Sequence, residues 1–358
     1  MKTIAELVQT RLPDAADGWP SLRDATRTGI WRYRPSLGLS HDIPEISLGE
    51  GDTPIVPLPR WGSAIGLDRA FAKLEYLGPT GSFKDRGAAA VIAVLAGQGF
   101  REIVEDSSGN AGAAMAAYAA RAGLKARIFV PESAAAAKRA QIGGYGAELV
   151  AIQGTREDVA AAAEAAVAAD GVAYASHSRH PAFVEGTKTC GLEIAASFAS
   201  ETLDHVVIPV GNGGLLLGIF KAYMELKAAG FSARLPRLHG VQAAVCAPLV
   251  TAFDRGSPQP AIVNPRPTVA SGVAVARPVR GHEVLAAIRV SGGTVVSVED
   301  DEAQTARFEL GRFEGLDLEF TSAIGFAAVG YLRNTGVIRQ QEVVVIPATG
   351  SGLKDIVV

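Results

Sequence analysis

The sequence is poor in features that mark several classes of protein. It has only two cysteines, Cys190 and Cys246, too few for a disulfide framework and without the paired spacing of a zinc site. We therefore expect no metal and a reducing compartment, the cytoplasm. The formal net charge is −3 and no block of like charges occurs, so neither nucleic acid nor an anionic membrane is an expected partner.

Long apolar segments are also missing. The longest apolar run covers residues 88–96, far short of the about 20 residues that span a bilayer. The N-terminal segment carries Glu6, Asp14 and Asp17 and has no long apolar core, so we expect no secretory signal. A small molecule is the partner that remains.

The composition is typical of a compact α/β protein. Hydrophobic residues make up 48% of the 358 residues, aromatic residues only 6%, and there are 40 glycines. The apolar mass is therefore aliphatic, and the length is sufficient for two domains with buried cores.

Short β-branched runs alternate with alanine-rich helical patterns, which predicts parallel strands joined by crossover helices. The predicted fold class is therefore α/β, with two open sheets. A segment rich in proline, glycine and serine, residues 254–281, is expected to be a long loop near the site. The predicted strands are residues 70–77, 102–106, 126–130, 148–152, 172–176, 205–210, 238–242, 294–298 and 342–347.

A lysine occurs at the turn between a strand-like run and an apolar helix, in Gly78-Pro-Thr-Gly-Ser-Phe-Lys-Asp-Arg-Gly87. Backbone N–H groups and the positive end of the helix dipole favour the neutral form of Lys84. A neutral amine is suited to attack a carbonyl and form a Schiff base. The alternative is an ordinary solvated surface lysine.

This motif resembles the fold type II pyridoxal phosphate enzymes, and within them the threonine synthases, with similarity from about Ser47 to Asp355. The resemblance implies pyridoxal 5'-phosphate as cofactor, held on Lys84 next to Phe83, and an amino acid as substrate. It also implies a homodimer of two-domain subunits with the cofactor in the cleft between the domains. The expected large domain comprises residues 1–82 and 188–358, and the small domain comprises residues 83–187.

A second motif, Ser107-Ser-Gly-Asn-Ala-Gly112, follows a predicted strand and begins a helix. Such a helix start presents free N–H groups to an anion. By the resemblance this loop binds the substrate carboxylate through Ser107, Ser108, Gly109 and Ala111, and Asn110 contacts the phenolic oxygen of the cofactor. The alternative is a plain strand-to-helix turn with a serine cap.

A glycine-rich loop, Gly211-Asn-Gly-Gly-Leu215, follows the predicted strand 205–210 and precedes a helix. Glycines let backbone N–H groups approach a phosphate, and the helix dipole favours its charge. The resemblance makes this loop the cup for the cofactor phosphate. The residues assigned to it are Gly211, Asn212, Gly213, Gly214 and Leu215.

The last motif, Thr349-Gly-Ser-Gly-Leu-Lys-Asp355, follows an apolar strand and resembles the end of the threonine synthases. By that resemblance the Thr349 hydroxyl faces the ring nitrogen of the cofactor. A neutral hydroxyl does not hold that nitrogen protonated, which makes the ring a weaker electron sink and favours prompt loss of a leaving group.

One stretch departs from the threonine synthase pattern. Glu185, Gly186, Lys188 and Thr189 match, but Phe183 stands where an arginine usually binds the substrate phosphate. An aromatic ring offers no donors to an oxyanion. Nearby polar residues are the candidate replacements, unless they form a solvated loop: Ser176, His177, Ser178, Arg179 and His180, of which Ser178 and Arg179 are predicted to bind substrate.

Three hypotheses therefore stand at the level of sequence. The first is a threonine synthase that converts O-phosphohomoserine to threonine and phosphate. The second keeps the cofactor but eliminates from a non-phosphorylated amino acid, as a serine or threonine dehydratase. It is motivated by Phe183 and by the segment Ser107–Gly112, which resembles the dehydratase loop. The third is a non-catalytic homologue that has kept the fold, against which the joint presence of Lys84, Asn110 and Thr349 argues.

Overall fold

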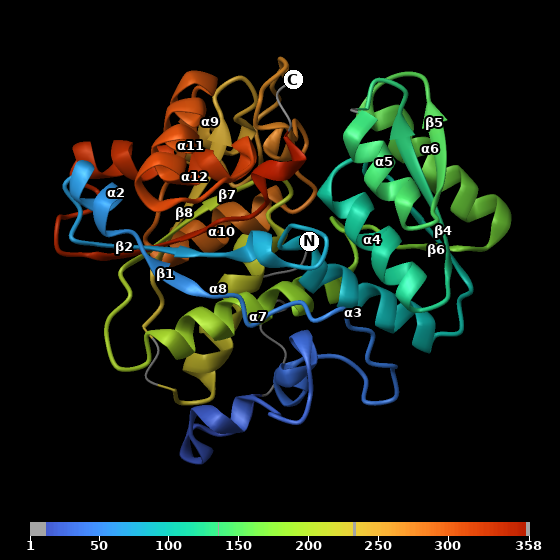
Figure 1. The fold of residues 1–358 in the computed structure, drawn as a ribbon, viewed down its shortest axis with the longest axis horizontal. Coiled ribbons are helices and arrows are strands. Elements are labelled where there is room, and N and C mark those ends of the chain that lie inside the picture. Colours follow the sequence, from blue (N-terminus) through green and yellow to red (C-terminus); the bar gives the residue numbers. More distant parts are fainter. Residues whose placement is uncertain (1–11, 135, 232–233, 356–358) are drawn as a thin grey trace.

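A computed structural model describes residues 12–134, 136–231 and 234–355, which form two lobes above a layer of helices (Figure 1). Each lobe is built on one β-sheet. The N-terminal strands and the C-terminal half of the chain form the larger lobe, and the middle of the chain forms the smaller one. In the described part of the chain no helix has the length and apolar character to cross a membrane.

The larger sheet has six strands in the order β1-β2-β10-β7-β8-β9. β1 and β2 pair antiparallel, and all other neighbouring strands pair parallel. Its central strands are continuous apolar runs, as expected for strands with both faces covered by helices. The strand bounds are β1 Ile55–Pro57, β2 Arg69–Lys73, β7 His205–Pro209, β8 Arg237–Ala243, β9 Val295–Val298 and β10 Val343–Pro347.

Helices cover both faces of the larger sheet. One core joins the sheet to α7 (Pro181–Ser197), α8 (Gly214–Ala228), α9 (Pro248–Asp254) and α10 (Gly281–Ser291). The core on the other face contains residues of a further group of helices. These are α2 (Pro59–Ala64), α11 (Asp300–Glu314) and α12 (Phe320–Asn334).

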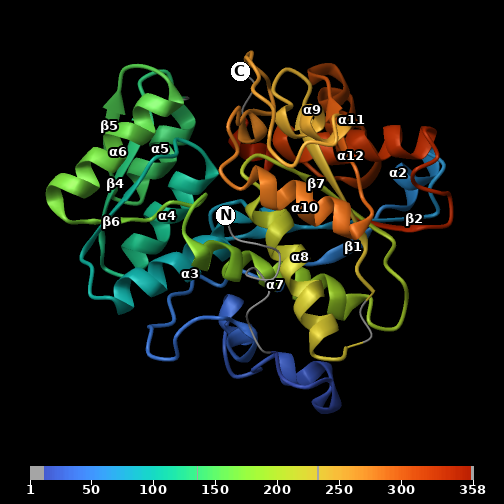
Figure 2. The ribbon, with the colours of Figure 1, turned by 180° about the vertical axis from the view of Figure 1, so that it is seen from behind.

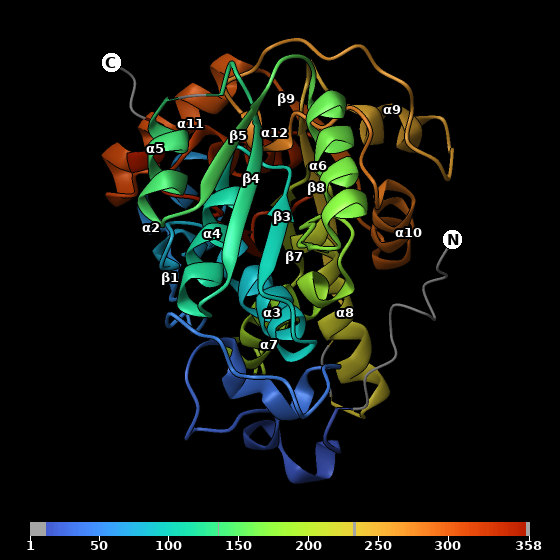
Figure 3. The same ribbon diagram turned by 90° about the vertical axis from the view of Figure 1, so that its right-hand side faces the viewer.

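The smaller sheet has four parallel strands in the order β5-β4-β3-β6. Figure 3 shows α6 on one side of these strands and α4 and α5 on the other. α3, which begins at Lys84, packs on the same face as α4. The bounds are β3 Glu102–Glu105, β4 Lys125–Pro131, β5 Glu148–Ile152, β6 Ala173–Tyr174, α3 Lys84–Gly97, α4 Asn110–Arg121, α5 Ala136–Gly144 and α6 Arg156–Asp170.

The N-terminal segment lies below α3 and α7 (Figure 2) and consists of short 3-10 helices. Its buried side chains enter both cores: Leu22 and Tyr33 join the core of the larger sheet, whereas Ile30 and Trp31 join that of α3 and α4. The segment therefore ties the two lobes together. The 3-10 helices are η1 Ala15–Asp17, η2 Trp19–Leu22 and η3 Gly29–Ser36.

The predicted fold class is confirmed, since both sheets are mainly parallel and helices cover their two faces. The predicted strand 70–77 is wrong in its second half. The strand ends at Lys73, and a 3-10 helix, η4 (Glu75–Leu77), follows because the Glu75 carboxylate turns inward to Arg86. The segment 254–281 is the expected loop apart from one 3-10 turn, η5 (Ser271–Val273). The proposed domain boundaries stay a prediction, and residues 1–11 and 356–358 lie outside the described residues.

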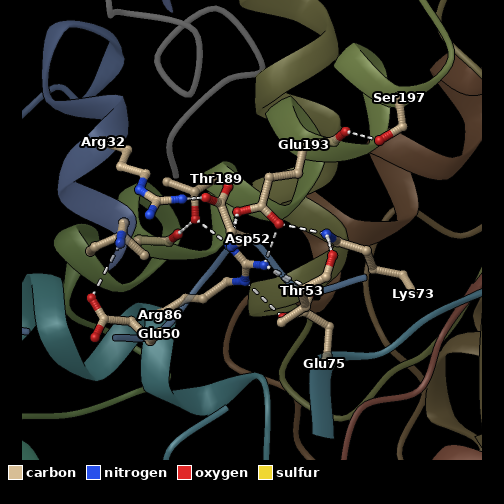
Figure 4. Close-up of polar contacts among 12 residues, drawn as sticks. Arg32, Glu50, Asp52, Thr53, Lys73, Glu75, Arg86, Thr189, Glu193 and Ser197 are labelled. Atoms are coloured by element: carbon tan, nitrogen blue, oxygen red, sulfur yellow. Dashed lines mark hydrogen bonds and ion pairs between the residues drawn. The ribbon is translucent and has the colours of Figure 1, made fainter. Parts of the chain in front are cut away.

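A buried ion-pair network holds the start of α3 (Figure 4). The guanidinium of Arg86 donates to both oxygens of Glu75 at 2.7 and 2.8 Å and to both oxygens of Glu193 on α7 at 2.7 and 2.6 Å. It also donates to the hydroxyls of Thr189 and Thr53. Glu193 accepts a further bond from Lys73 at the end of β2. Every charge is thereby paired, which offsets the cost of its burial.

Candidate active site

A cavity forms where the carboxyl ends of strands from the two sheets meet, the usual place for a ligand in open α/β folds. Segments that follow β3, β7 and β10 line it, together with the start of α3. The predicted site residues that line it are Phe83, Lys84, Ser107, Ser108, Gly109, Asn110, Ala111, Gly211, Asn212, Gly213, Gly214, Leu215 and Thr349.

Lys84 is the first residue of α3, and its side chain reaches the cavity. The turn before it is closed by Asp85, which accepts bonds from the N–H and hydroxyl of Thr80. The N–H of Phe83 donates to the carbonyl of Thr349, which joins this turn to the segment after β10. Two segments that are far apart in sequence are thus joined beside one amine.

The Lys84 amine has no hydrogen bond or ion pair to any described side chain and lies 4.7 and 5.5 Å from the ring centroids of Phe83 and Phe183. Desolvation lowers the pKa of Lys84 to about 8, against the opposing charges of Glu105 and Glu319. A substantial fraction is therefore neutral near physiological pH, which is the form that attacks a carbonyl.

The glycine loop Gly211–Leu215 joins the end of β7 to α8 and forms a cradle. Gly213 has φ +85, and a Cβ there would lie 2.1 Å from the side chain of Val284. A Cβ on Gly211 would lie 2.9 Å from the carbonyl of Gly272. Only glycine fits, and the first N–H groups of α8 lack partners within the helix, so the cradle suits a phosphate.

Asn110 is the first residue of α4, at the end of the loop that follows β3. Its amide donates to both oxygens of Glu319 at 3.1 and 3.0 Å and accepts from Lys354 at 2.9 Å. These partners come from the C-terminal part of the larger lobe, so Asn110 bridges the cleft. The sequence did not predict Glu319 as a site residue, although it lines the same cavity, and burial raises its pKa.

Thr349 is buried directly after β10 and lines the cavity. Its hydroxyl lies 2.8 Å from that of Ser322 at the start of α12, and Ser322 in turn accepts from the N–H of Gly350. The hydroxyl is held in a neutral hydrogen-bonded chain without a direct carboxylate partner.

Phe183, the residue in place of the expected arginine, is buried against Gly87 and Gly214 and forms part of the cavity wall. Ser178 and Arg179 do not line the cavity. Arg179 pairs instead with Glu164 on α6, and the carbonyls of Ser178 and Arg179 accept bonds from Arg280. Their role in substrate binding stays a prediction that these contacts do not favour.

The cations of the cavity were missed at the sequence level. Lys138 on α5 lines it and lies 3.5 Å from Ser271 and 3.6 Å from Asp355 across the cleft. Arg156, the first residue of α6, also lines it and has no bond to any described residue. Both residues lie in alanine-rich helical segments that look like ordinary helix in the sequence. Only their position in the folded chain, at the start of a helix or on one helix face, identifies them as cavity residues.

His177 is the one residue of the polar cluster 176–180 that lines the cavity. Its Nδ1 lies 2.6 Å from Oε1 of Glu105. Ser176 and Ser178 contact each other, and His180 caps α7. Glu105, Asp106 and His177 bring three possible metal ligands within 4.8 Å, but Nδ1 is already bonded to Glu105, and the absence of a metal stays a prediction.

Comparison with known proteins identifies this architecture. A family model described as pyridoxal-phosphate dependent enzyme matches residues 46–350. The threonine synthase of Methanosarcina acetivorans is 35% identical over 91% of this chain and 80% of its own length, and that of Synechocystis sp. is 36% identical over 97% and 88%.

Solved structures show the same fold. Threonine deaminase isoform 2 from Solanum lycopersicum superposes with a TM-score of 0.73 at 22% identity, covering 84% of this chain and 79% of the other. Maize serine racemase gives a TM-score of 0.71 at 23% identity, over 84% and 88%. Fold and site together define a pyridoxal phosphate-dependent enzyme of fold type II.

The chain belongs to the pyridoxal-phosphate dependent enzyme family and, within it, to the threonine synthase group. It is a pyridoxal phosphate-dependent lyase. The residues of the cavity fit this cofactor, because an unpartnered lysine of lowered pKa lies beside a cradle that any Cβ would fill.

Proposed function

We propose that the protein is a threonine synthase that converts O-phosphohomoserine and water to threonine and phosphate. The observation that carries this proposal is the pair of cations, Lys138 and Arg156, in the wall of the cavity that contains Lys84. They offer an anionic substrate group the charge that Phe183 cannot. The identity to curated threonine synthases over most of the chain supports the same substrate.

The roles of the residues follow from their places around the cavity. Lys84 attaches the cofactor and moves the proton at the substrate Cα, and the loop Ser107–Ala111 at the start of α4 binds the substrate carboxylate. The glycine loop Gly211–Leu215 holds the cofactor phosphate, and Phe83 packs beside the lysine. When bound, the cofactor supplies an electron sink that stabilises negative charge at Cα.

Asn110 and Thr349 orient the cofactor ring. With the cofactor bound, the Asn110 amide, now bonded to Glu319, would be available to an oxygen on the ring, and the neutral hydroxyl of Thr349, now bonded to Ser322, would face the ring nitrogen without protonating it. A cofactor ring that is a weak electron sink favours departure of the leaving group over racemisation, in which the proton returns to the opposite face of Cα. This arrangement suits a lyase.

The subunit is proposed to act as a homodimer in the cytoplasm. Its two cysteines are free and buried, which fits a reducing compartment. Light scattering of the purified protein gives the mass directly: a dimer has twice the 37.1 kDa of the chain.

The substrate is tested by incubating the purified protein, loaded with pyridoxal phosphate, with O-phosphohomoserine. Equal amounts of free phosphate and of threonine are the expected products, the first by a colorimetric assay and the second by NMR. Absence of both, with the cofactor bound, contradicts the proposed substrate.

A dehydratase acting on serine or threonine is the second candidate. It is favoured by Phe183, whose buried ring lines the cavity and offers an apolar contact to a short substrate. The same preparation is therefore given L-threonine and L-serine. Formation of a 2-oxo acid and ammonia at a higher kcat/KM than phosphate release selects this candidate over the first.

A further inference from the structure

His177 and Glu105 form a buried pair that the roles above leave unused. Glu105 is the last residue of β3 and is 0% exposed, and His177 follows β6 and is 7% exposed. The ring Nδ1 lies 2.6 Å from Oε1 of Glu105, and the backbone N–H of His177 donates to Oε2 at 3.3 Å. One carboxyl group is therefore bonded to both the ring and the backbone of His177.

The pair lies in the same wall as the lysine. The His177 ring lines the cavity and contacts the edge of Phe183, with 6.1 Å between ring centroids. The Phe183 centroid is in turn 5.5 Å from Nζ of Lys84. Phe183 is therefore near two groups that can carry protons, Lys84 at the start of α3 and His177 in the segment after β6.

The environment determines where the protons of this pair reside. Burial, with the negative charge of Asp106, raises the pKa of Glu105 well above its usual range. Burial, with the positive charges of Lys84 and Arg156, lowers the pKa of His177. Both shifts favour the neutral form of the group concerned, and in a neutral pair Oε1–H donates to Nδ1 while Oε2 accepts from the backbone.

A neutral imidazole that accepts at Nδ1 must carry its hydrogen on Nε2. Nε2 has no hydrogen-bond partner among the described residues, and the ring forms part of the cavity wall. The free donor of the pair is therefore available to a ligand in the cavity.

We propose that His177 is a second proton-transfer residue of this active site, acting at the leaving group and at the attacking water, with Glu105 as its positioning residue. The proposal rests on the function proposed above. It assigns transfer of the Cα proton to Lys84, and transfer of the protons of the leaving group and of the attacking water to His177.

The step balances as follows in bonds and protons. The C–O bond to the phosphate breaks, its electron pair goes to the leaving oxygen, and Nε2–H gives that oxygen its proton, so phosphate departs as HPO₄²⁻. The Glu105 proton moves to Nδ1. One Cβ–H bond also breaks, and its proton, carried by Lys84, forms the new C–H bond at Cγ in place of the C–O bond. The oxygen of water then bonds to Cβ, its second proton goes to Nε2, and the Nδ1 proton returns to Glu105.

The variant His177→Ala separates the two proton transfers. Phosphate release from O-phosphohomoserine is expected to fall by at least about 100-fold in kcat, the usual contribution of a general acid–base residue. Exchange of the Cα proton of L-2-aminobutyrate in D₂O, followed by NMR, is expected to keep its wild-type rate because it needs only Lys84. Added imidazole should restore part of the lost phosphate release.

Glu105→Gln is the matched variant, because its amide keeps both hydrogen bonds but cannot give up a proton to the ring. It should lower kcat and leave KM and cofactor absorbance unchanged. His41→Ala, at an exposed position away from the cavity, is the control and should match wild type.

The proposal is overturned if His177→Ala slows Cα exchange and phosphate release by the same factor, or if imidazole restores nothing. It is also overturned if EDTA removes activity and Zn²⁺ restores it, since the cluster would then be a metal site. If wild type exchanges the Cα proton but releases no phosphate, the proposed substrate is wrong. The same variants are then compared by 2-oxo acid formation from L-serine. A larger loss in this reaction than in Cα exchange supports the proposal, and an equal loss in both overturns it.

Discussion

At the scale of single residues, the chemistry depends on an amine that is neutral when it meets the cofactor. Desolvation lowers the pKa of Lys84 to about 8. Because a lysine must lose its proton before it attacks, the rate of capture should follow the neutral fraction.

This lowered pKa predicts the pH dependence of cofactor capture by the apoenzyme. The second-order rate, followed by absorbance in stopped flow, should rise from pH 6.5, reach half of its plateau at the Lys84 pKa of about 8, and level off roughly one pH unit above it, where Lys84 is almost fully neutral. A rate that keeps rising towards the ordinary lysine value of about 10.4 would contradict the lowered pKa.

Arg156 and Arg179 provide a second test at this scale. The Arg156 side chain lines the cavity and has no hydrogen bond or ion pair to another residue that the structure describes, whereas Arg179 pairs with Glu164 outside the cavity. Arg156→Ala should raise KM for O-phosphohomoserine by about 10-fold or more, as expected for loss of a charged contact of about 1.5–3 kcal/mol. Arg179→Ala, the control, should leave KM unchanged. A larger rise in KM for Arg179→Ala than for Arg156→Ala would instead support the prediction from sequence that Arg179 binds the substrate.

Sequence reasoning named most of the residues that line the cavity because they lie in strand–turn–helix motifs that can be recognised locally, and their role in cofactor binding stays a prediction. It missed Arg156, Lys138 and Glu319, which reach the cavity only through the packing of distant segments. His177 was one of several polar candidates, and only its bond to Glu105 on β3 singles it out.

At the scale of elements, the glycine cradle at the start of α8 decides whether a phosphate fits. Gly213 and Gly123 both have positive φ, +85 and +70, but a Cβ meets Val284 only at Gly213 and open space at Gly123. A side chain at either position would therefore be strained by the left-handed backbone, but only at Gly213 would it also clash with a neighbouring residue.

Substitution of each glycine by alanine should separate the effect of backbone strain on stability from the effect of the clash on cofactor binding. Gly123→Ala should cost about 1–2 kcal/mol in the free energy of unfolding, the strain of a left-handed backbone, with unchanged cofactor affinity. Gly213→Ala should cost more and weaken cofactor binding as well. Urea unfolding and cofactor titration measure the two effects, and equal affinity in both variants would contradict the cradle.

The strands were predictable from β-branched runs, and most observed bounds fall within one or two residues of the expected ones. α7 was not predicted as a helix, because the polar stretch 176–180 directly precedes it and its first turn contains the altered motif around Phe183. The matching residues Glu185 and Lys188 of that motif serve the packing of α7 on α8, where Lys188 contacts both Glu185 and Glu225.

At the scale of the whole molecule, the cleft is held by contacts between segments far apart in sequence. Arg86 joins η4, α3 and α7 through Glu75 and Glu193 and is 1% exposed. No local pattern reveals these partners, since they come together only in the folded chain.

Removal of this cation should therefore destabilise the whole fold. Arg86→Ala leaves the buried carboxylate of Glu75 without its ion-pair partner and that of Glu193 with Lys73 alone, and the expected loss is about 3–5 kcal/mol in the free energy of unfolding. The loss should be measured by urea unfolding monitored by circular dichroism. Arg179→Ala, an exposed ion pair, should cost no more than about 1 kcal/mol and serves as the comparison. Equal losses would show that the network does not stabilise the fold.

The central claim is that Lys84 carries the cofactor in this cleft, and one measurement tests it most directly. The protein loaded with pyridoxal phosphate is reduced with borohydride, digested and examined by mass spectrometry. The predicted result is the mass of the reduced cofactor on the peptide that contains Lys84, and its absence in Lys84→Ala. Label on a different lysine, or a protein that binds no cofactor at all, would contradict the account.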